Sequence, residues 1–287
     1  MSDTNSFILN RFFTKKTFDA IANNNNCSEY NSIIKKYSFD GGFKNNQEVI
    51  SNIYDYLDSK YRNEYYYKNT LLNKLLIGVH SINTTTALTE LPVAKSKADF
   101  VLINGKAVVY EIKTDLDNLE RLESQINDYY KAFNNVVIVT SENNYNDVLN
   151  KYGDSDVGIY VLTKRGSISR KKEPVSNNNN LLKSVMFKTL RKSEFERIIL
   201  DEYGALPDVS QFIYYKSCKQ LFESISTDKA YLYFIRELKL RDNVIKNKFV
   251  DVPYELKFLV YFSNYSEHDY DRLFEFLKEE AECTYQY

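Results

Sequence analysis

Residues 98–113, which read ADFVLINGKAVVYEIK, constrain the fold of this chain more than any other stretch. Two segments rich in β-branched and aromatic residues, 98–103 and 106–113, flank the pair Asn104-Gly105. An Asn-Gly pair between two such segments is the strongest short-range signal for a β-hairpin. The stretch therefore predicts two antiparallel strands joined by a tight turn.

The register of this hairpin decides which side chains share a face of the sheet. A two-residue turn would pair Asp99 with Tyr110 and place Asp99 and Glu111 on opposite faces. A three-residue loop that ends at the glycine, in a left-handed bulge position, pairs Asp99 with Val109 instead. Because side chains alternate along a strand, this second register puts Asp99, Glu111 and Lys113 on one face. We expect the three-residue loop.

Apolar periodicity extends the pattern to both sides of the hairpin and predicts an α/β fold, with a mixed central β-sheet flanked by helices. The expected helices before the hairpin span 7–22, 47–61 and 62–77, with a short strand at 86–91. After it we expect a helix at 115–133, a strand at 136–140, a helix at 145–152 and a strand at 157–163. Residues 181–282 read as mostly helical. The polar stretch 165–180 contains four consecutive asparagines and predicts a boundary between an α/β domain, 1–170, and a helical C-terminal domain, 181–287.

The scarcity of histidine and cysteine limits the chemistry available to the chain. Its three cysteines lie far apart and form no CxxC pair, which argues against a zinc site and a disulfide framework. Its two histidines have no partner in the pattern that nucleophilic or acid–base schemes require. Any catalytic or metal-binding chemistry is therefore expected to rely on carboxylate side chains. No apolar run is long enough to span a bilayer and the first residues lack the core of a signal peptide, so we expect a cytoplasmic protein with no membrane partner.

Two carboxylates and an ammonium on one otherwise apolar sheet face are costly to bury unless they are paired. A divalent cation would pair them. Oxygen ligands without His or Cys suit Mg²⁺ or Mn²⁺, and Lys113 would orient a water molecule or stabilise charge on a phosphate. The structural alternative is a surface hairpin with an incidental Glu-x-Lys.

Two flanking helices carry further candidates. Glu64 shares the helical spacing of Leu71 and Leu75 and is expected on their inward stripe as a metal ligand, or else as a first-turn acid that favours the helix dipole. Gln125 and Tyr129 are four residues apart and lie on one helix face, either beside the site or as ordinary edge-of-core residues.

In chain order, a helix Glu, an Asp, a Glu-x-Lys on a hairpin and a Gln-x-x-x-Tyr on the next helix resemble the PD-(D/E)xK nuclease superfamily. The Gln-x-x-x-Tyr extension is similar to its RecB-like branch, and the resemblance covers residues 64–163. Ala98 stands where the name of the superfamily has Pro, a position where that Pro is often absent.

This resemblance implies a role for each matching residue. Asp99 and Glu111 would hold the catalytic metal, with Glu64 completing its shell directly or through water. Lys113 would position the attacking water, and Gln125 and Tyr129 would steady the site and touch substrate phosphate. Segment 114–125 is also similar to uncharacterised bacterial members. The second-rank candidates are Glu90, Asp117 and Arg121.

The reaction implied is Mg²⁺-dependent hydrolysis of a phosphodiester, in DNA rather than RNA, with bacterial or phage defence as a context by analogy. The formal net charge is -1, yet residues 164–197 hold ten Lys or Arg against three Glu. Such a strip predicts contacts to a nucleic-acid backbone, although a solvated linker and helix face would have the same composition. The nucleic-acid-binding candidates are Lys164, Arg165, Arg170, Lys171, Lys172, Arg191 and Lys192.

Two rival functions stay open at this point. One is a catalytically weak, nucleic-acid-binding or scaffold subunit that works with a partner protein. The other assigns the main function to the helical region from residue 181 onward, which could form a homodimer or bind a partner. Metal-dependent cleavage that is lost in Glu111→Ala while DNA binding survives would separate catalysis from binding.

Overall fold

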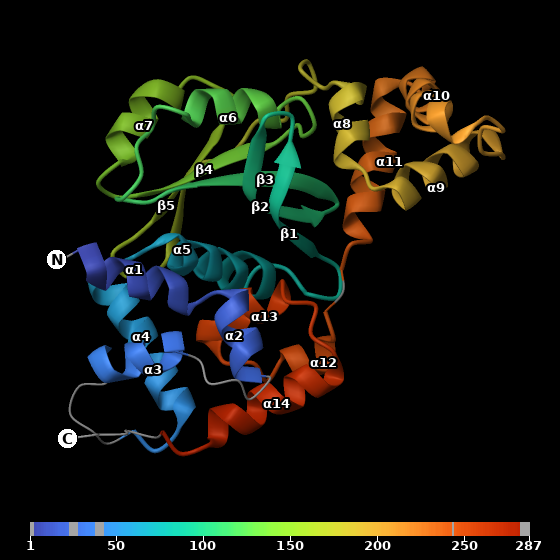
Figure 1. Ribbon diagram of the computed structural model, residues 1–287. Helices are drawn as coiled ribbons and strands as arrows, with labels where there is room; N and C mark the ends of the chain where they lie inside the picture. Colours follow the sequence, from blue (N-terminus) through green and yellow to red (C-terminus); the bar gives the residue numbers. More distant parts are fainter. Residues whose placement is uncertain (1–2, 23–27, 38–42, 243, 282–287) are drawn as a thin grey trace. The chain divides into compact units, whose positions relative to one another are not determined.

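The computed structural model describes residues 3–22, 28–37, 43–242 and 244–281 (Figure 1). The chain divides into two compact units. The first unit combines residues 1–79 with residues 243–287, and the second unit consists of residues 80–242. None of the helices in these described stretches is both long and apolar enough to span a membrane.

The second unit is built on a six-stranded sheet whose strands follow one another in sequence order (Figure 1). The strands are β1 (Thr86–Val93), β2 (Ser96–Asn104), β3 (Lys106–Lys113), β4 (Val136–Ser141), β5 (Gly158–Leu162) and β6 (Ile168–Lys172). β1, β2 and β3 pair antiparallel, β3, β4 and β5 pair parallel, and β6 returns antiparallel to β5. The predicted α/β fold with a mixed sheet is confirmed.

Helices and the sheet of the second unit share one apolar core. The helices are α6 (Leu122–Tyr129), α7 (Tyr145–Tyr152), α8 (Lys183–Thr189), α9 (Lys192–Tyr203), α10 (Gln211–Ser224) and α11 (Thr227–Lys239). Side chains of α6, such as Leu122 and Ile126, pack with Val109 of β3 and Ile138 of β4 in that core. The spacing of the buried residues of α6 follows the helical repeat, which is why this amphipathic segment covers an apolar sheet face.

The first unit is helical in its described parts. It contains α1 (Asp3–Phe12), α2 (Lys15–Ala22), α3 (Ser28–Tyr37), α4 (Asn46–Lys60), α5 (Glu64–Leu71), the π-helix η1 (Leu72–Ile77), α12 (Lys246–Phe249), the 3₁₀ turn η2 (Tyr254–Leu256), α13 (Lys257–Tyr261) and α14 (Glu267–Lys278). Buried Asn46 links the N-terminal and C-terminal parts of this unit. Its side-chain amide donates to the Phe276 carbonyl at 2.9 Å, and its backbone amide donates to the Glu279 carbonyl at 3.1 Å.

The units divide the chain differently from the predicted domains 1–170 and 181–287. Helices α8–α11 pack on the core of the sheet, whereas residues 244–281 group with the N-terminal helices. The polar stretch 165–180 is not a boundary, because it contains β6 and because backbone hydrogen bonds tie Val175 to Asp156 and Asn177 to Asn134. Composition alone does not distinguish a polar segment that is hydrogen-bonded to the domain from a linker between domains. The mostly helical C-terminal region is confirmed.

The predicted hairpin is present, but its register is shifted by two residues. Val101, not Asp99, lies opposite Val109, and Asn104 lies opposite Lys106 with Gly105 at the tip. Gly105 has a φ of 71°, the left-handed conformation that glycine adopts at little cost. A shift of two keeps every side chain on its face of the sheet. Asp99, Glu111 and Lys113 therefore still belong to one face of the sheet, although the predicted pairing of Asp99 with Val109 was wrong.

The tight contact at Gly158 in β5 supports a first prediction. A Cβ atom at this position would lie 2.8 Å from both N and Cδ of Pro174 and 3.0 Å from Cγ2 of Val137. Gly158→Ala should therefore lower the free energy of unfolding by about 1–3 kcal/mol, as overpacking does in other cores. Urea denaturation followed by circular dichroism measures the loss. Gln220→Ala, at an exposed helical position, is the control, and an unchanged midpoint for Gly158→Ala would contradict the prediction.

Candidate functional site

A carboxylate buried in the second unit, Glu111 on β3, lies at the centre of the candidate site. Its side chain is 1% exposed. Oε1 lies 2.9 Å from Nζ of Lys113, and Oε2 accepts a hydrogen bond of 2.6 Å from the hydroxyl of Tyr129. Both oxygens of this buried charge are thus paired, as burial of a carboxylate requires.

Lys113 joins Glu111 to helix α6. Two residues beyond Glu111 on the same strand, it projects from the same face, and its Nζ also donates to Oε1 of Gln125 at 3.0 Å. Gln125 and Tyr129 reach this point from one face of α6, as their four-residue spacing predicts. Four of the predicted site residues are therefore brought together: Glu111, Lys113, Gln125 and Tyr129.

Tyr129 links the two central strands of the site. Its hydroxyl lies 2.6 Å from Oε2 of Glu111 and 2.9 Å from the carbonyl of Lys97 on β2, so its one proton is donated to either acceptor. Burial, followed by the negative charges of Glu111 and Asp99, raises the pKa of Tyr129 well above its ordinary value. The phenol therefore stays protonated and acts as a hydrogen-bond donor at any physiological pH.

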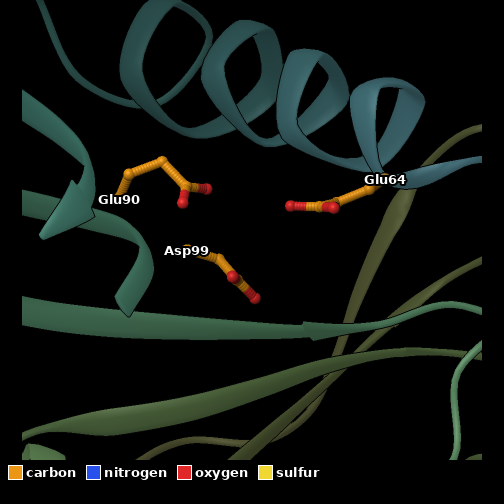
Figure 2. Close-up of side chains that lie close together, drawn as sticks. All are labelled: Glu64, Glu90 and Asp99. Carbon is orange, nitrogen blue, oxygen red and sulfur yellow. The ribbon is translucent and has the colours of Figure 1, made fainter. Parts of the chain in front are cut away.

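Asp99 and Glu90 form the acidic part of the site. Asp99 lies on β2, where Oδ2 accepts a 2.8 Å hydrogen bond from the backbone amide of Ile112 on β3. Glu90 lies on β1, and a carboxylate oxygen of each acid comes within 4.8 Å of one on the other (Figure 2). Glu90 adopts a φ of 52°, an uncommon conformation outside glycine, while the register of β1 with β2 is the same on both sides of it. This backbone conformation is a local feature that the sequence pattern did not indicate.

The expected pairing of Asp99 with Glu111 as metal ligands is only partly reproduced. Asp99 belongs to a group of side chains within the described residues that could hold a metal ion, and Glu90 belongs to it as well. Glu111 is not in that group; its oxygens pair with Lys113 and Tyr129. The second-rank candidate Glu90 accompanies Asp99 in the group, and the assignment of metal ligands stays a prediction.

Glu64 is the first residue of α5 in the first unit (Figure 2). Its side chain is 58% exposed and forms a 2.6 Å ion pair with Lys68, one turn later in the helix. Glu64 does not share the burial of Leu71 and Leu75, which are 0% and 3% exposed, and its predicted role as a metal ligand stays a prediction. The alternative, an acid that favours the helix dipole, describes its local environment.

The other second-rank candidates, Asp117 and Arg121, belong to the connection between β3 and α6. Oδ2 of Asp117 accepts hydrogen bonds of 2.8 Å from both the amide and the hydroxyl of Thr114. This turn delays the start of α6 to Leu122, seven residues later than predicted for the helix 115–133. Arg121 is exposed at the residue that precedes the helix. Asp117 therefore shapes the connection that leads into α6.

Sequence reasoning missed Asp128, the buried residue directly before Tyr129. Its Oδ2 accepts from the hydroxyl of Ser96 at 2.8 Å and from the amide of Lys95 at 3.2 Å, and its Oδ1 pairs with Lys131 at 2.6 Å. Burial opposes ionisation, but these hydrogen bonds outweigh it and lower the pKa of Asp128. The residue anchors the β1–β2 turn to α6. The sequence signal that could have indicated Asp128 is the position of its carboxylate next to the apolar stripe of this helix.

The predicted basic strip does not form one surface. Residues 164–172 belong to the β5–β6 hairpin at one edge of the sheet, whereas Arg191 and Lys192 follow α8, which packs on β1 at the other edge. Lys172 donates to the carbonyls of Tyr152 and Ser155, and its partial burial lowers its pKa. Cations on an exposed edge strand also protect that edge against pairing with other chains.

Comparison with known proteins places the chain in a family. Residues 58–255, more than half of the chain, match the family described as Bacteriophage P4 protein cII. The chain belongs to this family. Every residue discussed for the candidate site lies inside the matched stretch.

Two individual likenesses accompany the family match. Protein cII of Enterobacteria phage P4 is 28% identical over 173 residues, which make up 59% of this chain and 64% of that protein. The chain thus spans less than two thirds of the length of this relative. The SPO1766 protein of unknown function from Silicibacter pomeroyi has a TM-score of 0.28 and 8% identity, over 42% of this chain and 82% of the other. A likeness at that level carries no argument.

Proposed function

We propose that this chain is a metal-dependent phosphodiesterase that hydrolyses nucleic acid, with DNA as its substrate. The observation that carries the proposal is the buried Glu111–Lys113–Gln125–Tyr129 network beside the close carboxylates of Asp99 and Glu90. An ammonium aligned by two fixed acceptors next to two hard oxygen donors is suited to phosphate chemistry.

The donor set fits Mg²⁺ or Mn²⁺. Asp99 and Glu90 offer carboxylate oxygens within 4.8 Å of each other, and Lys97 already pairs with Glu90 at 3.2 Å. A divalent cation between the two acids would further offset the repulsion of their charges. These two residues would hold the ion, which when bound supplies a Lewis acid for a phosphate oxygen and lowers the pKa of a coordinated water. Oxygen-only ligands favour these hard cations over zinc or copper.

Four residues around the proposed metal site would position Lys113 and the substrate phosphate. Tyr129, held protonated, fixes Glu111 by its hydrogen bond, and Glu111 in turn fixes the ammonium of Lys113. Gln125 supplies a second acceptor that aims Lys113. Lys113 then places positive charge where an attacking water or a phosphate oxygen would lie. Lys97, which pairs with Glu90 at 3.2 Å and is exposed, would contact the substrate backbone beside the ion.

The test uses the full chain with supercoiled plasmid, linear duplex, single-stranded DNA and RNA, in EDTA, Mg²⁺ or Mn²⁺. Wild type should cleave only with a metal, and Asp99→Asn should reduce the rate at least about 100-fold. The matched control is Asp147→Asn, an exposed acid in the first turn of α7, which should cleave like wild type. Calorimetric titration with Mn²⁺ provides a second readout that does not depend on cleavage.

The outcomes separate catalysis from binding. Cleavage that disappears in EDTA and in Asp99→Asn, with weakened Mn²⁺ binding, supports the proposal. Wild type that binds DNA but cleaves no substrate with either metal overturns it. That result would support the second candidate, a nucleic-acid-binding or scaffold subunit, which is favoured by the full internal pairing of the Glu111 carboxylate.

A further inference from the structure

Asp128 of α6 is a buried carboxylate that has no part in the proposed reaction so far. Its Oδ2 accepts hydrogen bonds from the Ser96 hydroxyl at 2.8 Å and from the Lys95 amide at 3.2 Å, at the turn between β1 and β2. The hydroxyl of the next residue, Tyr129, lies 2.9 Å from the carbonyl of Lys97. Two consecutive residues of α6 therefore hold three consecutive residues of the β1–β2 hairpin.

The turn that Asp128 holds is not one that its own residues favour. Val93 pairs with Ser96, so Ala94 and Lys95 form a two-residue turn between the strands. Ala94 has a φ of 54°, a left-handed conformation that glycine adopts far more readily. A strained conformation of this kind persists where surrounding contacts fix it. The hydrogen bonds from α6 supply such contacts.

Strand pairing between β2 and β3 stops before this turn. The paired residues of β2 run from Phe100, opposite Tyr110, to Asn104, opposite Lys106. Residues 96–98 lie outside that ladder, and α6 contributes hydrogen bonds to them. The position of this end of the hairpin therefore depends on its contacts with α6.

The two acids proposed to hold the metal ion belong to the same end of the hairpin. Glu90 of β1 and Asp99 of β2 bring carboxylate oxygens within 4.8 Å of each other (Figure 2). Asp99 follows Ser96 by three residues, which is about 10 Å along a strand. Lys97, whose carbonyl faces the Tyr129 hydroxyl, also pairs its ammonium with Glu90 at 3.2 Å. A displacement of the turn would therefore change how the oxygens of the two acids lie.

We infer that Asp128 is a positioning residue for the metal site, an inference that rests on the proposed function. Its carboxylate fixes the β1–β2 turn on α6, and the turn fixes Glu90 beside Asp99. Asp128 thus acts through the hairpin and not through contact with the ion. Residues that orient metal ligands from behind raise metal affinity, and their loss typically weakens it about 10–100-fold.

Calorimetric titration of the full chain with Mn²⁺, and cleavage measured over a range of Mn²⁺ concentrations, test this role. Asp128→Ala should weaken Mn²⁺ binding at least about tenfold. The Mn²⁺ concentration for half-maximal cleavage should rise by the same factor, with little change in the maximal rate, because saturating metal restores the site. Asp128→Asn keeps an oxygen acceptor for the Ser96 hydroxyl and should retain most of the affinity.

Lys131→Met is the matched control. It removes the 2.6 Å partner of Oδ1 of Asp128 and leaves both contacts of Oδ2 with the turn in place, so Mn²⁺ binding should stay at wild-type level. Ser96→Ala should weaken Mn²⁺ binding, and its combination with Asp128→Ala should be no weaker than Asp128→Ala alone, since both act through one contact. Hydrogen exchange of the metal-free protein should be faster at the Lys95 amide in Asp128→Ala than in Lys131→Met.

The outcomes separate this inference from the proposed function. Wild type that neither binds Mn²⁺ nor cleaves nucleic acid overturns the proposed function and this inference with it. Wild type that binds Mn²⁺ while Asp128→Ala binds it equally well overturns this inference alone. A lower maximal rate at an unchanged Mn²⁺ midpoint, or an equal loss of affinity in Lys131→Met, would show that Asp128 only supports the fold and overturns it as well.

Discussion

Lys113→Met should destabilise the second unit by about 3–5 kcal/mol, the typical result of removing one partner of a buried ion pair. The side chain of Lys113 is 11% exposed and that of Glu111 is 1% exposed, with 2.9 Å between the charged atoms. Without the ammonium, the hydrogen bond from Tyr129 is the one that the Glu111 carboxylate keeps with the residues that the structure describes. Urea denaturation of the full chain measures the loss.

The double variant Glu111→Gln with Lys113→Met distinguishes a structural role from a catalytic one. It removes both charges, so no buried charge is left unpaired, and most of the lost stability should return. Nuclease activity should not return, because both the ammonium and the carboxylate that holds it are gone. Under the proposed function, cleavage should fall at least about 100-fold in each single variant and in the double variant.

The control for this pair is Lys151→Met. Lys151 forms an ion pair of 2.8 Å with Glu123 in the same unit, but the two side chains are 47% and 64% exposed. Exposed pairs contribute little, so stability and cleavage should stay at wild-type level. A double variant as unstable as Lys113→Met would show that the pair is not energetically coupled. Cleavage that recovers together with stability would show that Lys113 only supports the fold.

The parts of the site that the sequence predicted are those that follow from local periodicity. Alternation along β3 places Glu111 and Lys113 on one face whatever the register of the hairpin. The four-residue spacing of Gln125 and Tyr129 places both on one face of α6 for the same reason. The apolar pattern on both sides of the hairpin also predicts the mixed sheet, because strands with two apolar faces need cover on both.

The parts that it did not predict depend on contacts between distant segments. The register of the hairpin is shifted by two from the predicted one, with Asn104 opposite Lys106 and Gly105 at the tip, and the Asn-Gly pair alone does not fix how many residues the loop contains. Glu90 was only a second-rank candidate, and it lies beside Asp99 because β1 pairs with β2 in a register that the sequence did not indicate. Strand β6 reads as a polar loop, since its charged residues become a strand only through pairing with β5. The grouping of residues 244–281 with the N-terminal helices likewise has no local signal.

A second large effect is expected at Arg241, which lies near the end of the second unit. Its guanidinium binds both carboxylate oxygens of Glu194, with Nη2 at 2.6 Å from Oε2 and Nε at 2.7 Å from Oε1. Nη2 also donates to the carbonyl of Thr189 at 3.0 Å. The side chains of Arg241 and Glu194 are 8% and 4% exposed. Arg241→Met should lower the free energy of unfolding by about 3–5 kcal/mol, because the buried Glu194 then loses its close cation and keeps the 4.0 Å ion pair with the exposed Arg191.

This loss should depend on pH with a defined sign. Burial by itself raises the pKa of Glu194, but hydrogen bonds from Arg241 and from the amide of Arg191, together with the two positive charges, outweigh it and lower that pKa. A lowered pKa in the folded state means that the pair stabilises the protein above the unfolded pKa of about 4.3. The contribution is lost as pH falls through the folded-state value. The difference between wild type and Arg241→Met should therefore be largest at neutral pH and shrink in acid.

Denaturant titrations of both proteins at neutral pH and at several acidic pH values measure this difference. Lys192→Met is the control on the same helix, since Lys192 lies 3.8 Å from Glu196 with a side chain that is 73% exposed. Its effect should be small and independent of pH. A constant difference between wild type and Arg241→Met down to strongly acidic pH would mean that the guanidinium stabilises the unit by packing. A difference that shrinks with acid assigns the stabilisation to the charge of Glu194.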